Sequence, residues 1–124
     1  SVNKEVNSIT HKNIEFLGFV ENVEPYFLNS KLMIAPLRYG AGVKGKVGQA
    51  FEYYLPVVTT SIGAEGMFLE NELNAMIADN AVDFANKIIE VYTQNEIWDK
   101  LSKNSELSLY PFSKEKLEKT IAQF

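Results

Sequence analysis

The amino-acid sequence predicts an α/β fold in which a parallel sheet is covered by helices on both faces. Short apolar runs of strand length alternate with helical patterns, as they do in chains that build parallel sheets. One of these runs, residues 32–35, is apolar throughout rather than alternating, which is typical of a strand buried on both faces. From residue 80 onward only helical patterns occur, so we expect a helical C-terminus.

The composition favours one ordinary domain and excludes several classes of function. The 124 residues are 46% hydrophobic, which supplies a single core, and a net charge of -4 argues against a nucleic-acid partner. The absence of cysteine excludes disulfides, thiolate zinc sites and thiol catalysis, and it suits a reducing compartment. No apolar run approaches the roughly 20 residues of a membrane span. We therefore expect a cytoplasmic protein without a transmembrane segment.

Four apolar runs bounded by Gly, Pro, Asn or Asp are the expected strands, at residues 14–20, 32–37, 56–60 and 75–78. Folds of this kind usually begin with a strand, whereas residues 1–12 resemble the tail of a helix or a loop. We therefore expect a Rossmann-like three-layer sheet that lacks its first strand. An uncovered sheet edge recruits partners, which leaves self-association open.

Helical patterns separate the expected strands. Asn22 is a capping residue type, and Pro25 falls in the permissive first turn of the short helix that it would open. Residues 45–54 have the spacing of a helix with one buried face, which would carry Val47, Ala50, Phe51 and Tyr54.

Three further helices are expected toward the C-terminus. Asn80, followed by Asp83, has the spacing of a helix cap. The expected buried stripe of this helix consists of Val82, Ala85, Ile88, Ile89 and Tyr92. Asn95 would open the next helix and Ser113 the last one.

The segment 36–47 is the first candidate for a binding loop, because it follows a buried strand and opens an amphipathic helix. Ligands of open α/β sheets bind at the carboxyl ends of the strands, and a helix N-terminus favours phosphate. The glycines here permit close approach of the backbone, and the basic side chains supply positive charge, at Arg38, Gly40, Gly42, Lys44, Gly45 and Lys46. This pattern indicates a phosphorylated ligand.

The glycine spacing matches neither G-x-G-x-x-G nor the P-loop, so turn glycines with solvated basic side chains remain the alternative. A second glycine loop, residues 61–67, should lie at the same sheet edge. Its Glu65 is a candidate acceptor for sugar hydroxyls, with a solvated acid in a tight turn as the alternative.

The stretch 35–60 contains Gly-Ala-Gly-Val-Lys at 40–44 and Leu-Pro-Val-Val at 55–58, and Gly-Ala-Glu-Gly follows at 63–66. This combination resembles glycosyltransferases group 1, the retaining, family-4-like enzymes of GT-B fold. The likeness runs in order over nearly the whole chain.

The resemblance implies two Rossmann-like lobes with a cleft between them. The chain 1–124 would be a partial C-terminal lobe, which binds the nucleotide sugar, and its partner would be the missing N-terminal lobe of the same protein. The catalytic base is expected outside this chain. The resemblance also implies that no metal is required. No cofactor is expected, because the nucleoside diphosphate sugar is a substrate.

The resemblance also carries over donor-binding positions. They are Arg38, Gly40, Ala41, Gly42, Lys44, Gly45, Lys46, Gln49, Gly63 and Glu65. The family usually has two glutamates eight positions apart, one near the donor sugar and one on the ribose; those places are Ala41 and Gln49 here. Tyr54 stands where the family usually has glycine.

The function implied for the intact parent is hexosyl transfer to a glycan or lipid-linked acceptor, as in bacterial cell-envelope polysaccharide synthesis. Peripheral membrane contact through the parent stays open, and the chain alone is expected to be inactive. The alternative is a degenerate, non-catalytic lobe that serves as an interaction module, which Gln49 and Tyr54 motivate.

Overall fold

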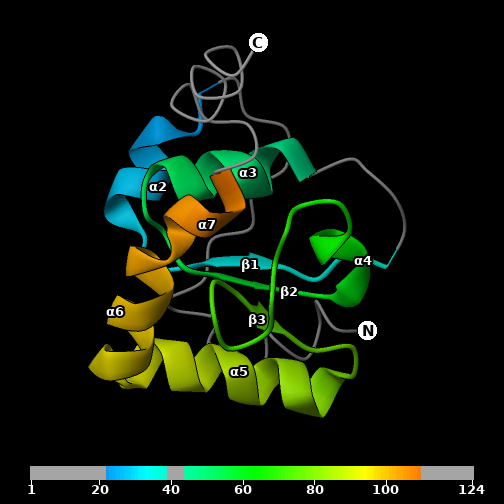
Figure 1. Ribbon diagram of the computed structural model, residues 1–124. Coiled ribbons are helices and arrows are strands. Elements are labelled where there is room, and N and C mark those ends of the chain that lie inside the picture. The colour runs from blue at the N-terminus through cyan, green and yellow to red at the C-terminus, as the bar shows by residue number, and fades with distance from the viewer. Residues whose placement is uncertain (1–21, 39–43, 110–124) are drawn as a thin grey trace, which may run out of the picture.

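The computed structural model describes residues 22–38 and 44–109, which form a parallel sheet with helices on both faces (Figure 1). The elements in chain order are α2 (Glu24–Asn29), β1 (Met33–Ala35), α3 (Lys44–Glu52), β2 (Val57–Thr59), α4 (Ser61–Ala64), β3 (Met76–Ile77), α5 (Ala81–Thr93), α6 (Asn95–Lys103) and α7 (Ser105–Leu109). In Figure 1, α2 and α3 lie on one side of the sheet and α5 lies on the other.

The three strands run parallel in the order β1-β2-β3. In the register, Ile34 lies opposite Val58, which lies opposite Met76. This arrangement confirms the predicted α/β class, although the strands are shorter than the apolar runs that predicted them. The strand predicted at residues 14–20 lies outside the described residues.

Successive residues of the strands contribute to two separate cores, because side chains alternate between the faces of a sheet. On β1, Ala35 belongs to the core under α2 and α3, whereas Ile34 packs against the core under α5 and α6. On β2, Val57 and Val58 divide in the same way, and both are fully buried. Burial on both faces explains why these runs are apolar without alternation.

Helix α5 begins as the sequence predicts. The Asn80 side chain accepts a hydrogen bond from the Asp83 backbone N–H at 2.9 Å, and the Asn80 amide donates to the Asp83 carboxylate at 2.6 Å. The predicted stripe is wrong in part. The residues that are buried are Phe84, Ala85, Ile88 and Val91, whereas Val82, Ile89 and Tyr92 are exposed. The helix is therefore rotated so that Phe84 and Val91 face the sheet.

Helix α3 ends differently from the prediction. Val47, Ala50 and Phe51 are fully buried as expected, but Tyr54 lies beyond the helix and is 44% exposed. Tyr54 adopts a left-handed backbone conformation with φ 56°, and the Leu55 N–H bonds back to the Ala50 carbonyl. This is a Schellman turn, which reverses the chain before β2 and directs the side chain at its left-handed position outward.

The remaining helices follow the sequence with small differences. Val23 rather than Asn22 occupies the N-cap position of α2, although the Asn22 side chain still accepts a hydrogen bond from the Glu24 N–H at 3.1 Å. Helix α6 starts at Asn95 as predicted and buries Leu101. The helix predicted from Ser113 lies outside the described residues.

None of the helices in the described part of the chain combines the length and the apolarity that a membrane crossing requires.

Candidate functional site

The two predicted loops begin at the same edge of the sheet, because β1 and β2 run parallel. A side chain joins them directly: the Thr60 hydroxyl donates a hydrogen bond to the Leu37 carbonyl oxygen. The buried Thr59 hydroxyl makes a similar bond to the Ala35 carbonyl at 2.9 Å. The prediction that both loops lie at one edge is therefore confirmed for the described residues.

Gly63 serves the packing of this edge. A Cβ atom at Gly63 would lie 2.1 Å from the Thr59 hydroxyl oxygen, far inside van der Waals contact. The Gly63 N–H also donates to the Thr60 hydroxyl at 3.2 Å, which caps α4. Gly63 is buried, and only glycine fits between α4 and the end of β2.

The side-chain carboxylate of Asp79 lies at the start of α4. Asp79, which follows β3, accepts hydrogen bonds from the Ser61 backbone N–H at 2.8 Å and the Ser61 hydroxyl at 2.6 Å. These bonds stabilise the charged form and hold the pKa of Asp79 below its usual value. Glu65 caps the other end of this short helix and is exposed.

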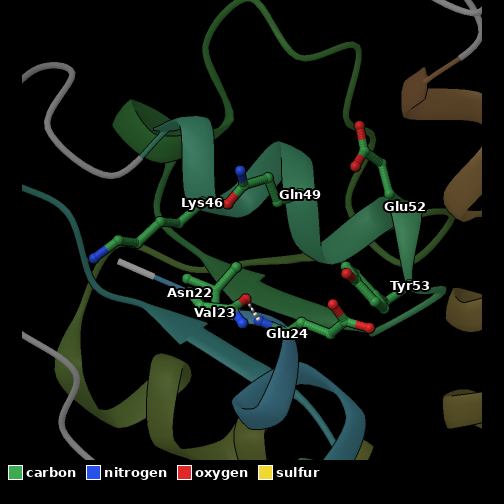
Figure 2. A pocket seen from close by; sticks show the side chains of 7 residues that line it. All are labelled: Asn22, Val23, Glu24, Lys46, Gln49, Glu52 and Tyr53. Carbon is green, nitrogen blue, oxygen red and sulfur yellow. Dashed lines mark hydrogen bonds between the residues drawn. The ribbon is translucent and has the colours of Figure 1, made fainter. Parts of the chain in front are cut away.

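A pocket of about 270 Å³ lies between the start of α2 and the exposed face of α3 (Figure 2). It contains two of the side chains that the sequence predicts for donor binding, Lys46 and Gln49. The complete lining consists of Asn22, Val23, Glu24, Lys46, Gln49, Glu52 and Tyr53. The structure thus brings together residues that are far apart in the chain.

Helical spacing explains how α3 supplies one wall of the pocket. Lys46, Gln49 and Tyr53 follow one another at i, i+3 and i+7, so they share one face. The opposite face, which carries Val47 and Phe51, is buried in the core. Because Val47 and Phe51 pack against the sheet, the opposite face of α3 points toward the pocket.

An aromatic contact shapes one end of the pocket. The ring of Tyr53 lies edge-on to the ring of Phe27 in α2, with 5.6 Å between the ring centroids. Phe27 is buried, so it holds the Tyr53 ring from behind while part of that ring stays exposed.

Charge is unevenly distributed in the pocket. The Lys46 side chain extends toward one end, whereas Glu24 and Tyr53 lie at the other end, with Gln49 between them (Figure 2). Glu52 adds a second carboxylate to the lining. Such a pocket can hold an elongated polar ligand that is anionic at one end and rich in hydrogen-bond donors at the other.

Five of the seven lining residues were not predicted from the sequence. Glu52 and Tyr53 carry a signal, because they lie three and four positions after Gln49, at the end of α3 and directly after it. Asn22, Val23 and Glu24 come from another element, and their place beside α3 is set by the packing of α2 on the sheet. No local pattern predicts that contact.

The other predicted positions lie elsewhere or outside the described residues. Arg38 is exposed just after β1 and does not line the pocket. Gly45 is exposed in the first turn of α3, and Lys44 is the first residue of that helix. Gly40, Ala41 and Gly42 fall outside the described residues. Within 22–38 and 44–109, no group of three or more His, Cys, Asp or Glu side chains is arranged to hold a metal ion.

A second hollow of about 580 Å³ lies on the opposite side of the sheet, beside β3 and α5. It contains none of the predicted donor-binding residues. Its lining consists of Asn71, Ile77, Ala78, Asp79, Asn80, Asp83, Asn86, Lys87 and Glu90. Several of these side chains already have structural roles, since Asn80 bonds to Asp83 at the start of α5 and Asp79 bonds to Ser61 at the start of α4.

Comparison with known families identifies the chain. The family model described as glycosyl transferases group 1 matches residues 2–94, which is three-quarters of the 124 residues. The chain belongs to this family. No curated protein matches the chain.

The matched region contains the pocket between α2 and α3 and both sheet-edge loops. Helices α6 and α7 follow it. Membership of this group 1 glycosyltransferase family supports a role in glycosyl transfer, with a sugar donor as substrate.

Proposed function

We propose that this group 1 glycosyltransferase chain is the donor-binding half of an enzyme that uses a nucleoside diphosphate sugar. The observation that carries the proposal is the pocket in which Lys46 and Gln49 lie on one face of α3. The nucleoside would occupy this pocket, and the diphosphate would extend past Lys46 toward the beginning of α3.

The chemistry of the lining suits a nucleoside. The Gln49 amide offers one acceptor and two donors, which match the hydroxyls of a ribose. The ammonium group of Lys46 suits a phosphate as a compact positive charge. The volume of about 270 Å³ lies just below the range of about 300–1,000 Å³ for small-molecule sites, so it fits a nucleoside better than a whole nucleotide sugar.

The position of α3 also suits a diphosphate. The helix follows β1 at the carboxyl edge of the sheet, and its first residues are Lys44, Gly45 and Lys46. A helix N-terminus carries a partial positive charge and free N–H groups, which stabilise a phosphate. In the reaction, such groups would stabilise the diphosphate as it leaves the sugar. The acceptor, a glycan or a lipid-linked sugar, and the catalytic base would belong to the parent's other lobe.

Calorimetric titration of the chain with UDP and GDP tests this proposal. The double variant Lys46→Ala/Gln49→Ala should weaken binding of the bound nucleotide at least about tenfold, because it removes a charge-assisted contact and the ribose contact. The matched control is Gln94→Ala/Lys100→Ala, which removes the same side-chain types at the N-cap and within α6 and should leave affinity unchanged. Equal affinity in wild type and the pocket variant would contradict the assignment.

The alternative of a degenerate, non-catalytic lobe rests on Gln49 and Tyr54. The backbone weakens the second argument, because Tyr54 adopts the left-handed conformation that a glycine would adopt there, and α3 still connects to β2 through an ordinary Schellman turn. Gln49 remains the argument for degeneracy. If Gln49→Glu were needed before any nucleotide bound, the degenerate lobe would be the better account.

A further inference from the structure

The end of the pocket away from Lys46 is acidic and has an aromatic wall. Glu24 and Tyr53 lie together at this end (Figure 2). Within the described residues, neither a hydrogen bond nor an ion pair engages the Glu24 carboxylate; the bond from Asn22 involves only the Glu24 backbone N–H. The carboxylate therefore retains its capacity to accept hydrogen bonds from a ligand.

From this arrangement we infer that the pocket selects guanine, so that the donor is a guanosine diphosphate sugar, with Glu24 as the residue that reads the base. This inference rests on the proposed function, because it assumes that a nucleoside occupies the pocket with its phosphates toward Lys46. It adds the identity of the base, which family membership leaves open.

Hydrogen-bonding chemistry distinguishes the bases at a carboxylate. An ionised carboxylate accepts hydrogen bonds and donates none. Guanine presents two neighbouring donors, N1–H and the 2-amino group, which match the two carboxylate oxygens. Uracil presents a single N3–H between two carbonyl oxygens, and these would face the carboxylate with like charge. Adenine offers its 6-amino group beside the acceptor N1, so it makes only one such bond.

The length of α3 agrees with this orientation. At a rise of 1.5 Å per residue, the six steps from Lys46 to Glu52, the last residue of α3, span roughly 9 Å along the helix, and Tyr53 follows directly. Gln49 lies between them, so phosphate, ribose and base would meet Lys46, Gln49 and Glu24 in the order in which a nucleotide presents them.

Tyr53 gives the base a surface on which to stack. Its ring contacts the buried Phe27 ring edge-to-face, and the residue as a whole is 36% exposed. Stacking on an aromatic ring tolerates every base, because each base has a π-face. Tyr53 therefore contributes affinity, and the choice among bases falls to Glu24.

The experiment compares GDP, IDP, ADP and UDP by calorimetry on the full 124-residue chain. IDP lacks only the 2-amino group of guanine, so it isolates the second hydrogen bond. We expect GDP to bind about tenfold more tightly than UDP, the size of a good two-bond contact to a base, with IDP between them. The Glu24→Gln variant should bind GDP about tenfold more weakly than the wild type, whereas its affinity for UDP should change little. Glu96→Gln on α6 is the matched control and should keep the preference, and melting curves should confirm that all variants fold.

The outcomes separate this inference from the proposed function. If UDP binds as tightly as GDP, and Lys46→Ala/Gln49→Ala abolishes that binding, the guanine inference is wrong and the donor-binding function stands. If GDP is preferred but Glu24→Gln leaves the preference intact, the assignment to Glu24 is overturned. If no nucleoside diphosphate binds, both proposals fail.

Discussion

Helices α3 and α5 cover opposite faces of the same sheet, yet they differ in how well their sequences match the usual preferences for helix caps and first-turn charges. Helix α5 has a side-chain cap, an acidic residue in its first turn and a continuous buried face. Helix α3 opens with Lys44, Gly45 and Lys46, and it has no acidic residue in its first turn. Cations near a helix N-terminus oppose the helix dipole by about 0.3–1 kcal/mol each.

This difference fits the proposed function, in which α3 contacts a ligand while α5 serves stability. A phosphate near the start of α3 would be stabilised by the helix N-terminus. Sequences usually break local rules at functional sites and compensate elsewhere. The buried face of α3, with Val47, Ala50 and Phe51, supplies part of that compensation.

The end of α3 shows a further compensation. Tyr54 holds a left-handed backbone conformation, which is unfavourable for a residue with a Cβ atom. Its carbonyl accepts a hydrogen bond from the Ser102 hydroxyl at 2.7 Å, and its own hydroxyl donates to the Glu106 carboxylate at 2.5 Å. The bond to Glu106 and the negative charge of that group raise the pKa of Tyr54. These contacts tie the pocket helix to α6 and α7.

The largest expected effect comes from truncating one aromatic residue in each region. Phe84→Ala on α5 should lower the free energy of unfolding by about 3–5 kcal/mol, because the side chain is 1% exposed and leaves a cavity. Tyr53→Ala, beside the pocket, should cost about 1 kcal/mol and weaken nucleotide binding instead. Urea unfolding together with calorimetric titration measures both. Equal losses of stability would erase the distinction between the two regions.

Two substitutions of Tyr54, just beyond the end of α3, should differ in melting temperature by a smaller amount. Tyr54→Gly relieves the left-handed strain and Tyr54→Ala retains it, while both remove the hydroxyl that bonds to Glu106. The melting temperature of the glycine variant should therefore exceed that of the alanine variant by roughly 5 °C. Circular dichroism melting curves provide the measurement. A lower melting temperature for the glycine variant would show that backbone strain does not govern this turn.

The fold was largely predictable because its signals are local. Continuous apolar runs located β1, β2 and β3, and the pair Asn80 and Asp83 located the start of α5. The orientation of α5 was not predictable in the same way. Val82 and Ile89 have the spacing of a buried face, but the larger Phe84 packs against the sheet and turns them outward.

Of the residues that line the pocket, only those in and directly after α3 were predictable from the sequence. Lys46 followed from the pattern of the 36–47 loop and Gln49 from the resemblance, and the spacing of the helix extends that set to Glu52 and Tyr53. The contribution of α2 depends on tertiary packing, because α2 meets the end of α3 through the contact between Phe27 and Tyr53 and not through a local pattern. Gly63 also needed the structure, since its contact with Thr59 shows a packing reason for the glycine.

Both proposals require that a donor nucleotide binds on the α3 side of the sheet. Titrating the ¹⁵N-labelled chain with GDP, and following its amide resonances by NMR, locates the bound nucleotide. We expect the largest shifts within 22–24 and 46–53, the segments that supply the pocket lining, and small shifts at residues 79–90 around the hollow beside β3 and α5. Larger shifts at 79–90 than at 46–53 would contradict it.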